Sequence, residues 1–276
     1  MKVVFDDSIG NDFLICWGVT VRLPKYSLFG ETRGERIRKV KEKILAAINE
    51  FSLDKFDSIH VKLASAWVRY YVFELSVNGE RFALNILSPN SPIKSFQNLE
   101  FPFIEEIAKP LAVCDEFMLQ EWVEGVPLSE LRDGFLLRDE EKAKMCIKLA
   151  SKLLYKIFKL GYVYTPWEDY EAILKGSKLF LLDVTRFVRK HLNPEEFFRF
   201  YYGAPFSSPE LLVEDEKNRV FWRGISEKDY FGTSRKEYER IFLEGIAEVC
   251  KEFEEFLLLS GMNEEEARKI WGRKRY

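Results

Sequence analysis

Residues 160–183 read LGYVYTPWEDYEAILKGSKLFLLD, and this stretch decides how the fold is interpreted. Gly161 follows a helical pattern and is the residue type that ends helices. The stretch closes with an apolar, strand-like run that ends in Asp183, and a carboxylate in that place is suited to holding a metal ion. Between these two residues, where the matching chemistry would be expected, the chain offers Tyr164 and Pro166. The surrounding elements therefore have to show whether this is a site.

Composition describes a globular chain. Its 276 residues allow one large domain or two modest lobes, and 47% hydrophobic residues suffice for a packed core. The net charge of −3 gives no strong field toward nucleic acid or an anionic membrane. No apolar run approaches the roughly 20 residues of a membrane span, and the acidic start does not resemble a signal peptide. We therefore expect a cytoplasmic protein without membrane contact.

Cysteine, histidine and glutamine usage narrows the class further. The four cysteines are widely spaced among apolar residues, which favours buried free thiols over a disulfide framework or a metal site. With only two histidines, a zinc site or catalytic triad built on histidine is disfavoured. Lys and Glu are abundant while glutamine is nearly absent, and this balance suits a heat-adapted source.

Hydrophobic patterns predict a β-rich N-terminal part. Residues 13–23 are rich in β-branched and aromatic side chains and predict a strand, and an apolar stripe predicts a helix over 35–51. Apolar runs on both sides of Asn78-Gly79 predict a hairpin, because this dipeptide favours the tight turn that joins two strands. A short helix is expected over residues 99–107, followed by two short strands.

The C-terminal part is predicted to be helical. One helix is expected over residues 139–160, ended by Gly161. A capping box at Ser234–Glu237 predicts the start of a helix that runs to about Ser260, closed by Gly261. Asn263 is expected to cap a last short helix that has acids in its first turn.

This order of elements resembles the protein-kinase-like fold over residues 58–260. The matching motifs are FMLQEWVEGVPLSEL at 117–131, LYKIFKLGYVY at 154–164, LFLLDV at 179–184 and YGAPFSSPELL at 202–212. The resemblance implies an α+β, bilobal fold with a β-rich N-lobe at 56–122 and a helical C-lobe at 123–276. Residues 1–55 would be a β–α extension that packs on the small lobe.

Several positions that hold phosphate in the kinase-like family have changed here. Where the family has a glycine-rich lid, this chain has residues 64–69, which begin with Ala64 and Ser65 and contain no glycine. Asn85 stands where the family has a lysine on the third strand, and an amide does not neutralise phosphate. A lysine from elsewhere, Lys62 or Lys94, remains an alternative. Glu105 or Glu106 stands for the helix glutamate that pairs with that lysine, or is a surface acid.

The hinge resembles the family more closely. Glu121 and Val123 occupy the positions whose backbone groups would bind adenine, so they are candidates for ATP binding. Gln120 stands at the position that guards the adenine pocket, beside Trp122.

The resemblance also assigns the stretch quoted above. Gly161 and Asp183 both place Tyr164 at the family's catalytic-loop histidine, Pro166 at its catalytic aspartate and Glu171 at its metal-binding asparagine. A proline accepts no proton. The resemblance makes Asp183 and Glu171 candidate Mg²⁺ ligands, and Glu168 or Asp169 a candidate substitute base. Asp183 is alternatively an acid that caps the turn after its strand.

Two hypotheses of function follow. The first is a pseudokinase, which holds a nucleotide or a protein partner without catalysis. The second is an atypical phosphotransferase that uses ATP, with Mg²⁺ on Asp183 and Glu171 and a protein or RNA substrate. We lean toward the first, because the lysine and the base are both missing.

RNA is a possible partner for two reasons. The basic tail GRKRY is similar to that of the small kinase of the archaeal tRNA-modifying KEOPS complex. Residues 22–43 are also rich in Lys and Arg, which indicates either a phosphate-binding patch or the solvated face of a helix.

Overall fold

The computed structural model describes residues 1–10, 13–16, 19–22, 32–66, 69–89, 91–127, 140–164, 172–194, 196–197 and 235–272. Over these residues the chain is α+β with a β-rich N-terminal part, as expected. It divides into a small unit, Met1–Leu99 with Ala108–Val123, and a large unit, Glu100–Ile107 with Glu124–Tyr276. No helix within the described ranges is long and apolar enough to cross a membrane.

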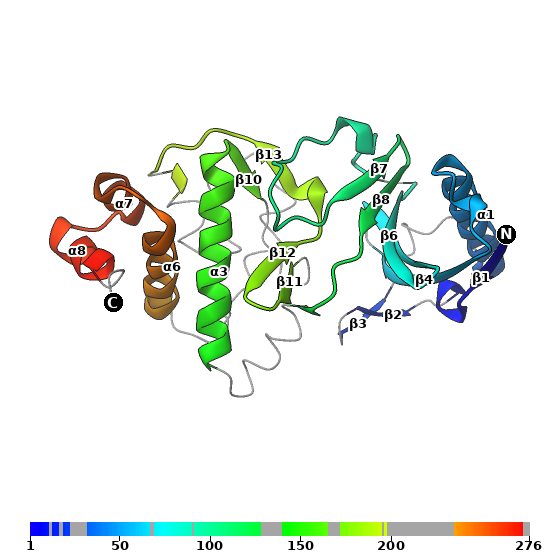
Figure 1. Cartoon of the computed structure of the whole chain (residues 1–276), viewed down its shortest axis with the longest axis horizontal. Helices are drawn as coiled ribbons and strands as arrows, with labels where there is room; N and C mark the ends of the chain where they lie inside the picture. Colours follow the sequence, from blue (N-terminus) through cyan, green and yellow to red (C-terminus); the bar gives the residue numbers. More distant parts are fainter. Residues whose placement is uncertain are drawn as a thin grey trace. The chain divides into compact units, whose positions relative to one another are not determined.

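The small unit is built on a six-stranded sheet with the strand order β1-β4-β5-β6-β8-β7 (Figure 1). Its strands are β1 (Lys2–Phe5), β4 (Ser58–Ala66), β5 (Tyr70–Val77), β6 (Glu80–Leu87), β7 (Pro110–Val113) and β8 (Phe117–Glu121). β1 pairs with β4 in parallel, whereas the other neighbours are antiparallel. A parallel pair needs a long connection between its strands, and helix α1 (Arg33–Glu50) lies in that connection.

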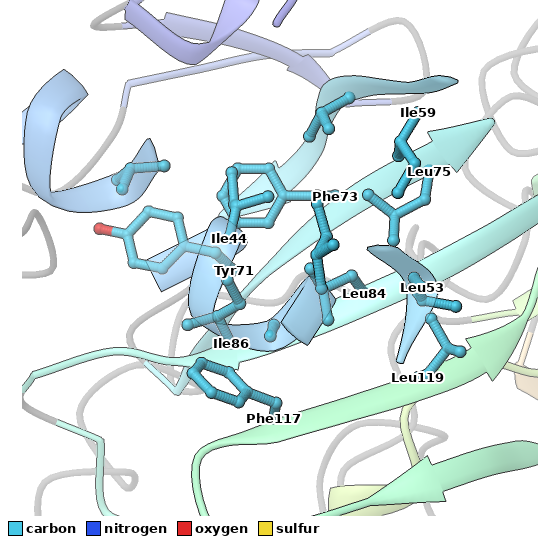
Figure 2. Close-up of a cluster of buried hydrophobic side chains, with 14 of the residues drawn as sticks. Ile44, Leu53, Ile59, Tyr71, Phe73, Leu75, Leu84, Ile86, Phe117 and Leu119 are labelled. Atoms are coloured by element: carbon cyan, nitrogen blue, oxygen red, sulfur yellow. The ribbon is translucent and has the colours of Figure 1, made fainter. Parts of the chain in front are cut away.

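Helix α1 and one face of the sheet enclose the core of the small unit (Figure 2). The helix begins after Thr32, whose hydroxyl accepts a hydrogen bond from the Glu35 N–H at 3.2 Å. Val40, Ile44 and Ile48 recur at helical spacing and are buried. They meet alternate residues of the central strands, such as Tyr71, Phe73, Leu75, Leu84, Ile86, Phe117 and Leu119. Each fully buried side chain of this size stabilises the fold by about 1.5–3 kcal/mol.

The predicted hairpin at Asn78-Gly79 is confirmed. Asn78 has φ of 51° and Gly79 has φ of 85°, so both residues have the left-handed backbone that a tight hairpin turn requires. The turn joins β5 and β6, which pair without interruption from Tyr70 with Leu87 to Val77 with Glu80.

Two predictions in this region are wrong. Residues 99–107 form no helix; the helical turn is the 3₁₀ segment η3 (Phe96–Asn98). Pro102 lacks an N–H and disfavours helical backbone at the residue before it, which explains the extended course. Residues 13–23 form not one strand but two, β2 (Phe13–Cys16) and β3 (Val19–Arg22), paired antiparallel. Strand propensity identifies the strand residues but does not locate a reversal between them.

The large unit combines four described helices with short strands. The helices are α3 (Glu140–Lys159), α6 (Arg235–Val249), α7 (Phe253–Ser260) and α8 (Glu264–Gly272). The strands are β9 (Val126–Pro127), β10 (Tyr162–Tyr164), β11 (Ala172–Lys175), β12 (Lys178–Leu181) and β13 (Phe187–Arg189). β11 pairs with both β12 and β9, and β10 pairs with β13.

Three predicted helix ends are confirmed, whereas Ser234, the predicted cap of α6, lies outside the described residues. Gly161 and Gly261 follow α3 and α7 with positive φ, and Asn263 accepts a hydrogen bond from the Glu266 N–H at 3.0 Å as the cap of α8. The single helix expected to reach Ser260 is instead two helices, because Glu252 takes an extended backbone between α6 and α7. The apolar pattern continues across this break, and residues 249–253 contain no Gly or Pro, so the sequence does not signal it.

The described cysteines are free thiols. Cys146 and Cys250 are buried and Cys114 is half-buried, in agreement with the prediction for these three residues. Burial raises the pKa of the Cys146 thiol to about 12, so this side chain stays protonated and unreactive at neutral pH.

Helices α3 and α6 lie side by side and approach closely at Gly245 (Figure 1). A Cβ added to Gly245 would lie 2.8 Å from the Lys148 carbonyl oxygen and would also collide with the Ser151 hydroxyl. The glycine therefore sets the distance between the two helices.

Replacing Gly245 with alanine is expected to destabilise the protein by about 1–3 kcal/mol, because the helices must move apart to admit the methyl group. Gly34→Ala in α1 is the matched control, since its Cβ meets nothing within 4 Å and the change should be neutral or stabilising. The measurement is the denaturation midpoint of each variant. Equal midpoints for Gly245→Ala and the wild type would contradict the close approach.

Ion pairs also join α3 to α6. The Lys148 ammonium lies 3.4 Å from Glu244 and 3.5 Å from Glu248, and Lys152 pairs with Glu248 as well. Burial alone would raise the pKa of Glu248. The hydrogen bonds and charges of Lys152 and Lys148 lower this pKa by more than burial raises it, so the net pKa is below the ordinary value of 4.5.

The Glu248 ion pairs predict a stability difference that depends on pH. Because the pKa is lower in the folded state, their contribution is present above about pH 4.5 and is lost as the pH falls through the folded value. Glu248→Gln should therefore cost about 0.5–1 kcal/mol at pH 7, less in high salt, and nothing at strongly acidic pH. Denaturation of both proteins across this pH range measures it. A difference that does not change with pH would contradict the role of these charges.

Candidate functional site

The sheet of the small unit has a second buried face, opposite α1, that carries polar side chains. Residues paired across antiparallel strands point to the same face, and Ser65, Val72, Asn85 and Met118 are paired in sequence across β4, β5, β6 and β8. Their neighbours along the strands, such as Leu84, belong to the core under α1. The row therefore lies on the other face.

Asn85 and Gln120 form an amide pair on this second face. They are only 2% and 3% exposed, and Asn85 Nδ2 donates a hydrogen bond to Gln120 Oε1 at 2.7 Å. The Gln120 Nε2 donates to the Ala108 carbonyl at 3.1 Å, and Asn85 Nδ2 also lies 3.4 Å from the Met118 carbonyl. Because backbone carbonyls can only accept, these contacts fix which way both amides point.

The Asn85 carbonyl oxygen, Oδ1, has no hydrogen-bond partner among the described residues. Both amide hydrogens are used, whereas this acceptor is buried and left over. A buried acceptor without a donor costs about 1–3 kcal/mol, so its presence calls for an explanation.

The candidates Ala64 and Ser65 lie at an irregularity of β4. The pairing of β4 with β5 shifts its register between Leu63 and Ser65, so Ala64 is the extra residue of a bulge. Ala64 is half-buried, and Ser65 is buried in the polar row described above. The bulged strand β4 is separated from Asn85 on β6 by the regular strand β5.

The two hinge candidates differ in how their polar groups are used. Glu121 is tied to Lys109: the Glu121 N–H donates to the Lys109 carbonyl at 2.9 Å, and the Lys109 N–H donates to Glu121 Oε1 at 3.0 Å. Val123 is buried, and no hydrogen bond joins its backbone to another residue in the described part of the chain. The backbone groups at Val123 are therefore the ones open to a ligand.

In the large unit, Asp183 lies two residues after the end of β12 and is 6% exposed. Its Oδ1 accepts hydrogen bonds from the Thr185 N–H at 2.8 Å and the Thr185 hydroxyl at 2.5 Å, and its Oδ2 lies 3.3 Å from the Arg186 Nε. It is the N-cap of the 3₁₀ turn η5 (Val184–Arg186). The carboxylate therefore holds the turn and pairs with a mostly buried arginine, which are structural roles that need no metal ion.

Tyr164, the residue at the family's histidine position, belongs to the core of the large unit. It is fully buried, and its ring meets that of Phe187 edge-on at a centroid distance of 4.9 Å. The other candidates of that loop, Pro166, Glu168, Asp169 and Glu171, lie outside the described residues, as do residues 23–31, 202–212 and the basic tail. Within the described ranges no three His, Cys, Asp or Glu side chains form a cluster that would hold a metal ion.

The remaining charged candidates make ion pairs or lie exposed. Glu105 pairs with Lys178 at 2.7 Å and Glu106 with Lys156 at 2.7 Å, all within the large unit. On α1, Arg38 pairs with Glu42, Lys39 with Glu35 and Lys43 with Glu116. Lys62 and Lys94 are exposed. Acids therefore offset these three cations, two of them on α1 itself and the third, Glu116, just before β8.

A cavity that the sequence did not indicate lies against α3. It has a volume of about 560 Å³ with an apolar floor, which includes Leu149, Leu153 and Leu179. Its rim carries four lysines, and each of these pairs with a glutamate: Lys152, Lys156, Lys159 and Lys178. Lys152, Lys156 and Lys159 follow helical spacing on α3, but periodicity alone does not reveal a hollow beside the helix.

Comparison with known proteins supports one assignment. The chain is 50% identical, over 274 residues, to an uncharacterized protein of Archaeoglobus fulgidus, and the match covers 94% of this chain and 95% of that protein. This chain belongs to the same family as that archaeal protein. No family model matches the sequence. Among solved structures, the complex of Rv3197 with erythromycin from Mycobacterium tuberculosis is 14% identical, covers 76% of this chain and 69% of that one, and has a TM-score of 0.43.

The structural role of Asp183 is testable by Asp183→Asn. The amide keeps an acceptor for Thr185 but loses the charge opposite Arg186, so we expect a loss of about 1.5–3 kcal/mol in stability, measured by denaturation in EDTA. Asp54→Asn, an exposed acid of the 3₁₀ turn η2 (Leu53–Lys55), should change stability little. If wild type and Asp183→Asn were equally stable in EDTA but differed in Mg²⁺, the carboxylate would be a metal ligand instead.

Proposed function

We propose that this chain is a protein-kinase-like protein that binds an adenine nucleotide or a protein partner and does not transfer phosphate. On this proposal residues 56–122 are its N-lobe, residues 123–276 its C-lobe, and residues 1–55 an extension. The motifs at residues 117–131 and 179–184 motivate the resemblance, and the α+β architecture is compatible with it.

The observation that carries this proposal is the amide pair of Asn85 and Gln120. Phosphoryl transfer depends on cations that neutralise charge as it develops on the phosphate. At the position where the kinase-like family has a lysine, this chain has a buried amide whose hydrogens are already bonded to Gln120 and Met118. An amide so fixed supplies no charge and leaves no donor for a phosphate oxygen.

Asp183 supports the proposal from the other unit. Mg²⁺ requires carboxylate oxygens that point at it with little competition. The Asp183 oxygens are engaged by Thr185 and Arg186, so metal binding would cost the cap and the ion pair. The open backbone groups at Val123, in contrast, leave adenine recognition available.

Binding without transfer is tested by a pair of measurements. ATP should raise the melting temperature equally with Mg²⁺ and with EDTA, and a ligand at a hundred times its Kd adds about 2.7 kcal/mol. Incubation with γ-labelled ATP and Mg²⁺ should transfer no label to water, to this protein, to other proteins or to tRNA. Asp183→Asn should leave the ATP-induced shift unchanged.

The opposite outcome identifies the alternative. Label transfer that requires Mg²⁺ and is lost in Asp183→Asn would establish an atypical phosphotransferase, with Glu171 as second metal ligand and Glu168 or Asp169 as base. No shift with ATP would instead leave only the protein partner.

A further inference from the structure

The unpaired acceptor of Asn85 determines what kind of group can approach it. Oδ1 carries lone pairs only, so it attracts a hydroxyl, amino or ammonium hydrogen and repels the oxygens of a phosphate. Its orientation is fixed by Gln120 and the Met118 carbonyl, so the amide cannot turn its hydrogens toward an anion without losing both bonds. Asn85 Oδ1 therefore favours a ligand group that donates a hydrogen bond.

The surrounding face selects against charge as well. Its buried residues are uncharged: Ser65, Tyr70, Asn85, Met118 and Gln120. Burying an anion against such a surface is costly unless a cation accompanies it. The cationic side chains of these strands are engaged elsewhere or exposed, since Arg81 pairs with Glu74 at 3.4 Å and Lys62 is exposed.

We infer that the sheet face opposite α1 binds an uncharged nucleoside more tightly than its charged nucleotides, with a ligand hydroxyl or amino group donating a hydrogen bond to Asn85 Oδ1. The nucleoside class rests on the proposed function; the preference for a neutral donor rests on Asn85 itself. A hydrogen bond to a buried acceptor that has no other partner contributes more binding free energy than the same bond to an exposed group. The reason is that the bond removes the free-energy cost of a buried acceptor without a donor. A phosphate placed there would leave Oδ1 without a donor and add a buried charge without a cation.

Calorimetric titration of the full chain with adenosine, AMP and ATP in EDTA tests the inference. Adenosine should bind at least tenfold more tightly than ATP, with AMP between them. Asn85→Leu keeps the volume but removes the acceptor, and it should weaken adenosine binding about tenfold. Lys55→Ala, at an exposed position of η2 outside the sheet, is the control and should change neither affinity.

A second variant and a second measurement keep the inference testable if Asn85→Leu does not fold. Asn85→Lys replaces the acceptor with a cation and should reverse the preference in favour of ATP. A high-resolution crystal structure with adenosine should show a ligand hydroxyl or amino group within about 3 Å of Oδ1.

Three results would overturn the inference. They are ATP binding as tightly as adenosine, no adenosine binding at all, and an ordered water only at Oδ1 in the adenosine complex. The first leaves the proposed function intact. Mg²⁺-dependent transfer of phosphate would contradict the proposed function, whichever ligand bound more tightly. The failure of the inference and the failure of the proposed function are therefore distinguishable.

Discussion

Two amide side chains, Asn85 and Gln120, lie 2.7 Å apart inside the small unit, and neither carries a charge. A buried cation would need a buried carboxylate close by, and the pair would have to recover several kcal/mol of lost hydration per ion. An amide pair avoids that cost, because each group needs only hydrogen-bond partners, and backbone carbonyls of β8 and Ala108 provide them. The sheet can therefore bury its second face without counterions, and the acceptor left over at Asn85 becomes the main polar feature of that face.

The parts of the fold that were predicted from sequence are those set by local physics. The helices at 33–50 and 140–159 follow their apolar stripes, the hairpin follows Asn78-Gly79, and three helix ends follow Gly161, Gly261 and Asn263. The errors arose at Pro102, which disfavours helical backbone before it, and where the outcome depends on distant contacts. The segment before β7 is extended rather than helical, and there the Glu106 carbonyl accepts a hydrogen bond from the Leu181 N–H, a contact far along the chain. The parallel pairing of β1 with β4 likewise has no local signal.

The candidate site divides in the same way. Sequence alone identified Asn85, Glu121, Val123 and Asp183 as positions to examine, because a motif fixes positions along the chain. It did not predict what each polar group bonds to. The capping of η5 by Asp183 was foreseen as an alternative, whereas the partnership of Asn85 with Gln120 depends on the register of β6 and β8. Register places their side chains on one face, and only the folded sheet reveals that one acceptor is left over.

The described ion pairs of α3 lie at the surface, where water hydrates their charges. The lysines of α3 meet glutamates of α6 and α7 at the surface, where each pair costs little to hydrate and contributes little on its own. Among the described ion pairs, Asp183 with Arg186 is the most deeply buried, and there Thr185 supplies the extra hydrogen bonds that such a pair needs. On the second face of the sheet, the described ion pair of Arg81 with Glu74 is more exposed. A ligand on that face would be held by directed hydrogen bonds and by shape, so its affinity would depend weakly on salt, unlike a phosphate or RNA held by exposed lysines.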